Sequence, residues 1–593
     1  MDNDSRLFDI VHSQRMADSM RIAYAKKDPK KPGNNWVNYS LHETVGVIDR
    51  ISLGLIKLGI KKGDNIALIS NNRPEWNFVD FGIQQVGAVV VPIYPSISYN
   101  ELKYIFNDSE VKLCFVDNAE LAKKIKSITA ETPSLTHVYS FDKNTVAEYW
   151  GKVVAETKIG ELTIVEQHKD RVNPNDLATI IYTSGTTGTP KGVMLSHFNI
   201  ASNIVALSKI LPFINGNKAL SFLPLSHVFE RTISYAYMAN GVSIYYAENL
   251  ETIVENLKEV GPDYFTTVPR LLEKVYEKII EKGNSLEGLK RNLFFWAIDL
   301  GKKFELNQNM GIWYNLQLKL ARKYVFSKWH SALGGNIQAI VSGAAALQPQ
   351  LARIFAAAEI PIIEGYGLTE TSPVLCSNRL EIKERRIGTV GSALPGVEIK
   401  IAVDGEILAK GPNIMVGYYK REDLTNEVFD SEGWFHTGDI GEFAENRFLK
   451  IIDRKKELFK TSGGKYVAPQ QVENKYKESL FIEQIMVVGE NKKFVGALIV
   501  PSIINLTSWC MKKDLHFDNT EAMLREDIIK DKIQREIEAI NSQISHVEQV
   551  KSFILLSKEW TASDGELTPT AKLKRRVIQE RFALDIESLY SES

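Results

Sequence analysis

Residues 182–192 read YTSGTTGTPKG, and they say more about the architecture than any other part of the chain. The apolar segment 177–182 leads into them and has the length and composition of a buried strand. The small residues let backbone N–H groups approach an anion closely, while the hydroxyl side chains and the Lys191 ammonium add further donors. The stretch therefore predicts a strand that ends in a phosphate-binding loop. The residues expected to contact phosphate are Thr183, Ser184, Gly185, Thr186, Thr187, Gly188 and Lys191.

This loop differs from the P-loop of kinases and GTPases. That motif has glycine just before its lysine and Ser or Thr just after it, whereas Pro190 and Gly192 stand in those places here. A flexible Ser/Thr/Gly linker would explain the composition. It would not explain an apolar strand before the stretch and the run Lys191-Gly192-Val193 after it.

The composition is that of an ordinary globular protein with more than one domain. The chain has 593 residues, 44% hydrophobic and 24% charged, which is too long for a single core. A formal net charge of −1 gives no sign of a nucleic-acid partner, and we expect none. Cys114, Cys376 and Cys510 are scattered and fit neither a zinc motif nor a disulfide framework. With no signal-peptide pattern and no membrane-spanning stretch, the chain is predicted to be cytoplasmic.

Short apolar segments alternate with amphipathic helical stretches over the first two-thirds of the chain, which is typical of parallel α/β sheets. The predicted strands cover residues 66–70, 89–94, 112–117, 242–247, 264–268, 337–342 and 361–363. Ligand loops are then expected at the carboxyl ends of strands, where the phosphate-binding stretch stands.

The later part of the chain has a different residue pattern. Between 388 and 449, Gly and Pro are frequent and polar residues alternate with apolar ones; a charged helical insert follows at 520–543. We therefore expect an α/β protein in two domains. Residues 1–453 would form parallel α/β subdomains with a small β-barrel-like unit at about 388–450. Residues 454–593 would form a small, mobile α+β domain, hinged at the charged run DRKKE (453–457).

Residues 270–330 are unusually basic, with twelve Lys or Arg against six Asp or Glu. Apolar residues recur there at helical spacing: Leu289, Leu293, Trp296, Leu300, Trp313, Leu316, Leu320 and Tyr324. A basic helical pair that carries aromatic residues could lie on an anionic membrane surface. The favoured interpretation is a helical cover packed on the core, because apolar stripes at this spacing are usually core.

Five further motifs follow the loop: VSGA at 341–344, EGYGLTET at 364–371, GWFHTGD at 433–439, DRKK at 453–456 and LTPTAKLKRR at 567–576. In this order and spacing they resemble the core motifs of the adenylate-forming superfamily, from about residue 40 to the C-terminus. The segments NNRPEW (71–76), PLSHVFER (224–231) and EGYGLTETSPV (364–374), with the helical insert before Val341, are similar to its long-chain fatty acyl-CoA synthetase branch.

The resemblance implies a reaction in two halves. A long-chain fatty carboxylate attacks the α-phosphate of Mg-ATP, which gives acyl-AMP and pyrophosphate; the thiol of CoA then attacks the acyl carbonyl and AMP leaves. ATP and Mg²⁺ are the implied cofactors, CoA the co-substrate, and the chain is expected to be a monomer or a homodimer.

The same resemblance implies the catalytic residues. Lys572 matches the lysine that bridges carboxylate and α-phosphate; the alternative is one lysine among several on a basic helix. Glu370 matches the carboxylate that holds Mg²⁺, with Thr183 as a second metal ligand, and Thr369 would donate to the α-phosphate. His227 would lie between the acyl and nucleotide pockets as a binding or gating residue. The alternative is a satisfied core histidine.

The nucleotide and hinge positions are also implied. Asp439 would accept the ribose hydroxyls with Arg454 beside it, or else be an exposed turn aspartate. Tyr366 would stack on adenine, or else be a core tyrosine. Lys456 matches the hinge between the half-reactions. The remaining predicted residues are Gly343, Ala344, Glu364, Gly365 and Gly367 around adenine, and Gly463 and Gly464 at the pantetheine channel.

Other functions stay open at this stage. One is an adenylating ligase for a short or aromatic acid, or for a separate carrier protein. Another is a non-catalytic fatty-acid-binding protein, which the presence of Lys572, Glu370 and Asp439 disfavours. A P-loop enzyme is disfavoured by Pro190 and Gly192. The acyl chain length is not predicted.

Overall fold

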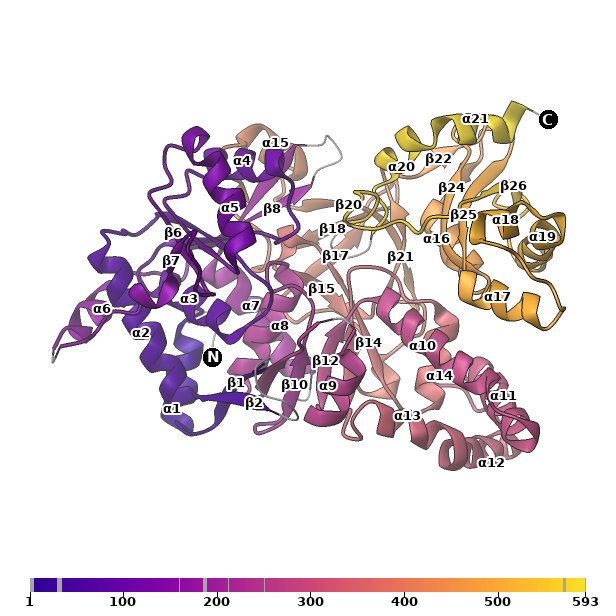
Figure 1. Ribbon diagram of the computed structural model, residues 1–593, viewed down its shortest axis with the longest axis horizontal. Helices are drawn as coiled ribbons and strands as arrows, with labels where there is room; N and C mark the ends of the chain where they lie inside the picture. The colour runs from indigo at the N-terminus through magenta and orange to yellow at the C-terminus, as the bar shows by residue number, and fades with distance from the viewer. Residues whose placement is uncertain are drawn as a thin grey trace.

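Each of the seven predicted strands is a strand in the computed structural model, which describes residues 5–28, 35–158, 160–184, 189–211, 213–249, 251–568 and 572–591. They are β3 (Asn65–Ile69), β4 (Val89–Pro92), β5 (Leu113–Val116), β11 (Ser243–Tyr246), β12 (Tyr264–Thr267), β13 (Ala339–Ser342) and β14 (Ile362–Gly367). Strand β3 pairs in parallel with β4 and β5, and β13 pairs in parallel with β12 and β14. The predicted α/β class with parallel sheets is confirmed (Figure 1).

These strands belong to two large sheets. Within the described residues their orders are β19-β9-β8-β4-β3-β5-β6-β7 and β16-β15-β14-β13-β12-β10-β11-β1-β2. The other strands of the first sheet are β6 (His137–Ser140), β7 (Glu148–Tyr149), β8 (Leu177–Ser184), β9 (Pro190–Ser196) and β19 (Gly417–Tyr418). Those of the second are β1 (Ile22–Lys27), β2 (Trp36–Ser40), β10 (Lys218–Ser221), β15 (Val374–Ser377) and β16 (Ser392–Ala393).

Helices α3 (Pro74–Gln85) and α8 (Val228–Ala239) are buried along almost their whole length and share one core with strands of both sheets. Asp80 of α3 and Arg231 of α8 form an ion pair inside this core, and Arg231 also donates to Thr179 Oγ1 of β8 at 2.8 Å. Because loss of either partner would leave a buried charge, the pair holds α3, α8 and β8 in one arrangement. The other helices around the sheets are α1 (Asp9–Ala17), α2 (Leu41–Lys57), α4 (Tyr99–Asp108), α5 (Ala119–Ile128), α6 (Leu162–Lys169), α7 (His197–Ile210), α9 (Ile253–Val260) and α14 (Pro349–Ala357).

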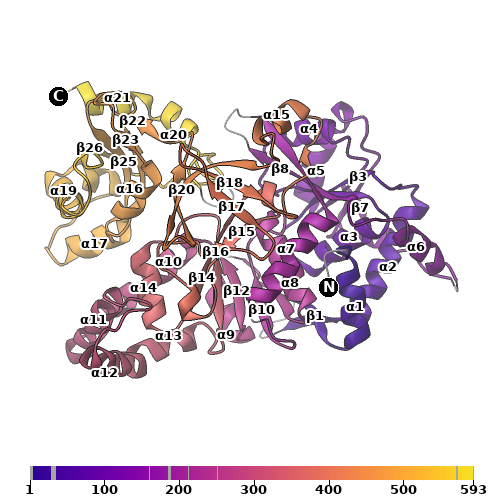
Figure 2. The same cartoon turned by 180° about the vertical axis from the view of Figure 1, so that it is seen from behind.

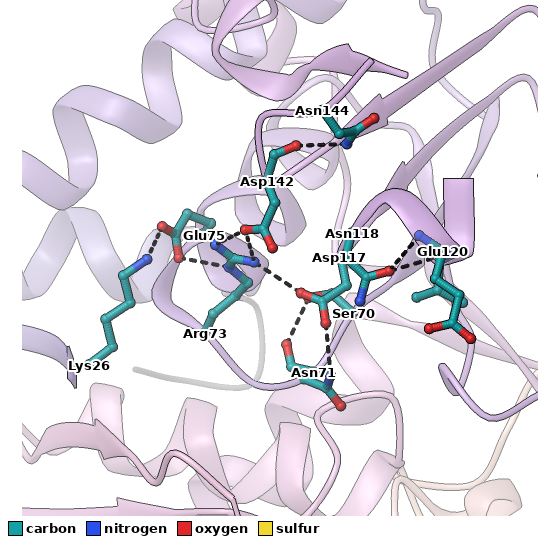
Figure 3. Close-up of polar contacts among 11 residues, drawn as sticks. Lys26, Ser70, Asn71, Arg73, Glu75, Asp117, Asn118, Glu120, Asp142 and Asn144 are labelled. Atoms are coloured by element: carbon teal, nitrogen blue, oxygen red, sulfur yellow. Dashed lines mark hydrogen bonds and ion pairs between the residues drawn. The ribbon is translucent and has the colours of Figure 1, made fainter. Parts of the chain in front are cut away.

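The NNRPEW motif joins the two sheets (Figure 3). Arg73 donates to Asp117 Oδ1 at 2.9 Å and to Glu75 Oε2 at 3.2 Å, and so ties the chain after β3 to the end of β5. Asn72 reaches the other sheet: its amide donates to the Leu223 carbonyl at 2.7 Å and accepts from the Leu225 N–H at 2.9 Å. The motif therefore fixes the segment that follows β10.

The region of the predicted β unit, at about 388–450, contains an antiparallel sheet in the order β17-β18-β20-β21. Its strands are β17 (Glu398–Ile401), β18 (Glu406–Lys410), β20 (Phe435–Ala444) and β21 (Phe448–Arg454). The segment between β18 and β20 leaves the unit, pairs with β9 of the first sheet through β19, and forms α15 (Glu422–Val428).

The C-terminal part has a hydrophobic core of its own, built on the strands β24 (Ile482–Val488), β25 (Val495–Pro501) and β26 (Val550–Leu555). The predicted charged helical insert is present as α18 (Thr520–Arg525) and α19 (Asp527–Asn541), and the buried isoleucines of α19 face this core. The other elements are β22 (Phe459–Lys460), β23 (Tyr466–Val467), α16 (Pro469–Tyr476), α17 (Ile503–Met511), α20 (Arg575–Arg581) and α21 (Ala583–Ser591). The division at residues 453 and 454 and the mobility of this part stay predictions.

The basic insert is helical as predicted: α10 (Pro269–Asn284), α11 (Gly288–Lys302), α12 (Ile312–Ala321) and α13 (Ser327–Ala332). The interpretation of its apolar stripe as core is wrong for six of the eight residues. Leu300 is buried and Trp296 packs against the core, but the other six are exposed: Leu289, Leu293, Trp313, Leu316, Leu320 and Tyr324. The core face of these helices consists instead of residues such as Phe294, Ile298 and Leu318. The periodic pattern predicted the helices correctly, but it did not predict which of their apolar residues face the core.

Candidate active site

The carboxyl ends of three strands of the second sheet bring the first predicted site residues together. Strand β13 runs into Gly343, β14 contains Glu364 and ends at Gly367, and the chain after β10 reaches His227 at the start of α8. Parallel sheets bind ligands at this edge, because the loops that follow the strands gather there.

Close backbone packing explains the glycines at this edge. A Cβ at Gly343 would lie 2.9 Å from the Phe229 ring, and one at Gly367 would lie 1.7 Å from the Pro373 carbonyl oxygen. Gly365 has more room, with its nearest neighbour at 3.5 Å. Ala344 adopts a left-handed backbone with φ of 70°, which turns the chain sharply after β13. Phe229, which covers Gly343, is a site residue that sequence reasoning missed.

Polar contacts link Tyr366 to the antiparallel unit. The Tyr366 hydroxyl donates to Asp439 Oδ2 at 2.7 Å, and Asp439 Oδ1 lies 3.3 Å from Arg454 Nε. Asp439 and Arg454 are direct partners in β20 and β21, so the strand register places the guanidinium beside the carboxylate. Burial raises the pKa of Asp439, and Arg454 and then Tyr366 oppose that shift. Since Asp439 is 5% exposed and lies within a strand, the alternative of an exposed turn aspartate is wrong.

Tyr418 of β19 joins the hairpin of β8 and β9, which flanks the predicted phosphate-binding loop, to Glu370. Its hydroxyl donates to Glu370 Oε1 at 2.9 Å, and Lys191 Nζ lies 5.0 Å from the centre of its ring. Thr183 is the antiparallel partner of Lys191 in the hairpin of β8 and β9. Tyr418 lies far from the loop in sequence and was not predicted. Gly185, Thr186, Thr187 and Gly188 lie outside the described residues, and Ser184 is described only as the last backbone position of β8.

These groups fit Mg²⁺ held on phosphates. The Tyr418 contact fixes one oxygen of Glu370, and Thr369 lies beside Glu370 in the same short 3₁₀ turn. Carboxylate and hydroxyl oxygens from Glu370 and Thr183 are the hard donors that Mg²⁺ prefers, and phosphate or water supplies the rest of such a shell.

Lys572 reaches the same region from the C-terminal part. Two hydrogen bonds join Thr568 to Lys572: the Lys572 N–H donates to Thr568 Oγ1 at 3.0 Å, and the Thr568 N–H donates to the Lys572 carbonyl at 2.8 Å. Figures 1 and 2 both show the chain before α20 reaching over β20. Burial and the Arg454 charge lower the pKa of Lys572 to about 8, while the Asp439 and Glu370 carboxylates act in the opposite sense. The predicted catalytic lysine and the predicted nucleotide residues therefore share one electrostatic environment.

His227 begins α8 and faces this environment as a neutral ring. Its Nδ1 accepts from the Phe229 N–H at 3.1 Å, which caps the helix and leaves the proton on Nε2. Burial, and then the Lys572 charge, lower the pKa of His227 to about 4. A ring that stays neutral at physiological pH and already accepts a helix N–H is suited to bind or gate, as predicted, and not to act as a general base. Asn72, which holds Leu223 and Leu225, positions this segment.

Glu364 stands apart from these contacts. Its carboxylate accepts a long hydrogen bond of 3.4 Å from the Leu347 N–H and lines a small cavity together with Asn378 and Arg385. Burial raises the pKa of Glu364 to about 8. Its contact with adenine stays a prediction.

Residues 20–419 match the sequence family described as AMP-binding enzyme, and residues 457–593 match the AMP-binding enzyme C-terminal domain. The chain belongs to the AMP-binding enzyme family.

Sequence identity to curated relatives shows which branch of this family the chain resembles. This AMP-binding enzyme is 34% identical over 566 residues to long-chain-fatty-acid–CoA ligase FadD15 of Mycobacterium tuberculosis, covering 94% of this chain and 93% of the relative. It is 33% identical over 603 residues to human long-chain-fatty-acid–CoA ligase 1, covering 95% of this chain and 84% of the relative. The predicted resemblance to the long-chain branch of the adenylate-forming superfamily is confirmed.

Solved structures agree on the fold of this AMP-binding enzyme. The adenylation domain of a carboxylate reductase from Mycobacterium chelonae has a TM-score of 0.78 at 21% identity, covering 99% of this chain and 91% of that chain. ATP-bound MatB from Rhodopseudomonas palustris has a TM-score of 0.71 at 22% identity, covering 98% and 99%.

Three predicted residues of this AMP-binding enzyme lie on the surface of the C-terminal part. Lys456 is exposed, and Gly463 and Gly464 form an exposed turn between β22 and β23. Among the described residues, the contacts of this turn are within the C-terminal part; the Ser462 N–H, for example, donates to the Lys492 carbonyl at 2.9 Å. Their roles as hinge and channel residues stay predictions.

The electrostatics of Lys572 predict an alkaline limit to adenylation. The ammonium form is the one that can neutralise anions, and its lowered pKa means that it is lost as pH rises through about 8. We expect kcat/KM for ATP–pyrophosphate exchange, which reports the free enzyme, to fall above that pH. Because the pKa of His227 is near 4, titration of this ring should not change kcat/KM in the neutral pH range. The guanidinium of a Lys572→Arg variant keeps its charge at alkaline pH. The residual kcat/KM of that variant should therefore not fall above about pH 8. A wild-type profile that stays flat well above this pH would contradict the assignment.

Proposed function

We propose that this chain activates long-chain fatty acids, first to acyl-AMP with release of pyrophosphate and then to acyl-CoA with release of AMP. The observation that carries the proposal is the position of Lys572, which shares one electrostatic environment with Asp439, Arg454 and Glu370. The identity to long-chain ligases over almost the whole chain supports the choice of acid.

In the first half-reaction both reacting groups are anions, so attack requires positive charge between them. Lys572 and Arg454 supply that charge, and their partial desolvation strengthens the interaction with an anion. Asp439 and Tyr366 orient the nucleotide, the former through the ribose hydroxyls and the latter through adenine. Glu370 and Thr183 would hold Mg²⁺, which neutralises phosphate charge when bound.

For the second half-reaction we propose that the C-terminal part turns about Lys456 and brings Gly463 and Gly464 to the site. Support comes from their exposure and from the separate core of that part, which permits motion as a rigid unit. Lys572 would then leave the site, because the chain that carries it belongs to the same unit.

For its surroundings we propose a cytoplasmic chain, monomeric or homodimeric, that makes peripheral contact with a membrane through residues 270–330. No helix in the described part of the chain is long and apolar enough to cross a membrane. The exposed apolar residues of α11 and α12 support the membrane contact.

The test is pyrophosphate release from Mg-ATP with straight-chain acids from short to very long, with and without CoA. We expect a long-chain optimum with AMP and acyl-CoA as products. Pyrophosphate release that never yields a CoA thioester would mean that a carrier protein is the acceptor. Absence of release with every acid would overturn the proposal in favour of a non-catalytic fatty-acid-binding protein.

A further inference from the structure

Helices α11 and α12, with the helical turn that follows α12 at Arg322–Phe326, expose a group of large apolar side chains. Ile312 is 90% exposed, Leu289 87% and Trp313 72%. Leu293, Leu316, Leu320 and Tyr324 are also exposed. These seven residues are called the outer face below. Single exposed apolar residues are common on protein surfaces, but seven within 36 consecutive residues form a patch of the kind that marks an interaction site.

On α12 the outer face is separate from the face that the helix buries. Phe294, Ala297 and Ile298 of α11, and Leu318 and Ala321 of α12, pack into the core. On α12 the residues Trp313, Leu316 and Leu320 follow one another at spacings of three and four, so they form one stripe along the helix. Helix α12 is therefore apolar on two sides, and folding of the chain uses only one of them. On α11 the exposed Leu289 and Leu293 lie on the same stripe as the buried Leu300, nearer the start of the helix.

Positive charge surrounds the outer face. Residues 288–332 contain eight basic and two acidic residues, although the whole chain has a net charge of −1. One of the acids, Glu305, pairs with Arg353 at 2.7 Å, and one of the basic residues, Arg322, pairs with Glu359 at 3.0 Å. Seven cations have no ion pair within the described residues: Lys290, Arg291, Lys302, Lys303, Lys319, Lys323 and Lys328. The segment thus presents a positive charge that its own fold does not neutralise.

The type of these residues favours a lipid surface over a protein partner. Lysine is depleted at protein–protein interfaces, whereas six of the seven unpaired cations in this part of the described chain are lysines. Tryptophan and tyrosine are enriched where a protein meets the headgroup region of a membrane, and the outer face contains Trp313 and Tyr324. Lysines beside an apolar helical face are also typical of helices that lie in the membrane interface.

We propose that the outer face docks this chain on a membrane surface rich in anionic phospholipid. Ile312, Trp313 and Leu316 would enter the boundary between headgroups and acyl chains, while Lys319 and Lys323 contact phosphate groups. In Figures 1 and 2 the two helices lie at one end of the molecule, where a flat surface can reach them. The docking rests on the membrane contact proposed above for residues 270–330 and specifies its residues and its lipid; it does not depend on the proposed catalytic activity, and it would place the enzyme where long-chain acids partition.

The test uses the full chain and sedimentation with vesicles of phosphatidylcholine alone or with added phosphatidylglycerol. We expect binding to the anionic vesicles only, weakened by high salt because surface charges are screened. An apolar variant, I312S/W313S/L316S, and a charge variant, K319E/K323E, should each weaken binding by about tenfold or more. Because all five side chains are exposed, melting temperatures should stay close to wild type.

A matched control lies on α17 and just after it. Ile504 and Met511 are 63% and 67% exposed and Lys512 and Lys513 follow, so I504S/M511S and K512E/K513E repeat the same changes elsewhere. Both controls should bind vesicles like wild type. Wild-type failure to bind anionic vesicles, or equal weakening by the control pair, would overturn the proposal.

Two further readouts distinguish membrane docking from self-association and from catalysis. If the outer face is a contact between copies of this chain, I312S/W313S/L316S will change the mass measured by light scattering and leave vesicle binding intact, which would also overturn the proposal. Pyrophosphate release with a detergent-dispersed acid should be the same in wild type and in the docking variants. Absence of the proposed activity in wild type would refute the proposed function without affecting the vesicle result.

Discussion

Replacement of Lys572 by alanine is expected to lower the rate of acyl-adenylate formation by about 10²–10³-fold or more, as for loss of a key transition-state donor. In the proposed reaction the partly buried ammonium supplies positive charge where the carboxylate and the α-phosphate approach each other. Attack of CoA on preformed acyl-AMP should be largely spared, because the charge repulsion has already been overcome at that stage. ATP–pyrophosphate exchange measures the first step, and single-turnover thioester formation from acyl-AMP measures the second.

The control for this variant is Arg576→Ala. Arg576 is four residues further along the same basic segment, but it is exposed and pairs with Glu580 on its own helix, at 3.5 Å. Loss of this charge should leave both half-reactions unchanged. An equal loss of both half-reactions in Lys572→Ala would refute the role assigned to Lys572.

Replacement of Asp439 by alanine is expected to weaken ATP binding by on the order of 10²-fold, because the proposed acceptor of the ribose hydroxyls is lost and a hydrogen bond to a charged group contributes about 1.5–3 kcal/mol. The change removes the acceptor for the Tyr366 hydroxyl and the counter-charge of Arg454 together. Asp439→Asn should lose less, because its amide oxygen can still accept from Tyr366. Equilibrium binding of ATP and KM for ATP measure the effect.

Thermal unfolding distinguishes a binding role of Asp439 from a structural one. Burial raises the pKa of this carboxyl, which means that its charge is unfavourable in the folded protein without a ligand. Asp439→Ala should therefore keep a melting temperature near that of wild type. Asp404→Ala is the control, because it removes an exposed carboxylate that pairs with Lys455 in the same antiparallel unit, at 2.7 Å. Unchanged ATP affinity in Asp439→Ala, or loss of affinity only through unfolding, would contradict the assignment.

The strands and the site edge were predictable because their causes are local. Short apolar runs flanked by turn residues predict β13 and β14, and the rule that loops gather at carboxyl ends places Gly343 and Tyr366 together. The position of Lys572 was predictable only through the resemblance to a family, since nothing local distinguishes it from Lys574 or Arg576.

Other parts of the site depend on contacts between distant segments. Tyr418 meets Glu370 and Lys191 because the chain leaves the antiparallel unit and pairs with β9, and no periodicity encodes that pairing. Phe229 covers Gly343 for a similar reason: a helix start and a strand end meet in space. The ion pair of Asp80 and Arg231 could not be predicted from the sequence either, since Asp80 there only interrupts an apolar stretch.

The sequence by itself determined the α/β class, the strands and the family, because these follow from local composition and from motif order. Tertiary structure alone decided which side of α12 faces the core, and which part of the apolar stripe of α11 is covered. A helix with apolar residues on two faces gives the same periodic pattern for either orientation, and the choice depends on how the rest of the chain packs against it. It also decided that the charges of Asp439 and Arg454 act on Lys572, because these residues are more than a hundred positions away in sequence and only the folded chain brings them within electrostatic range.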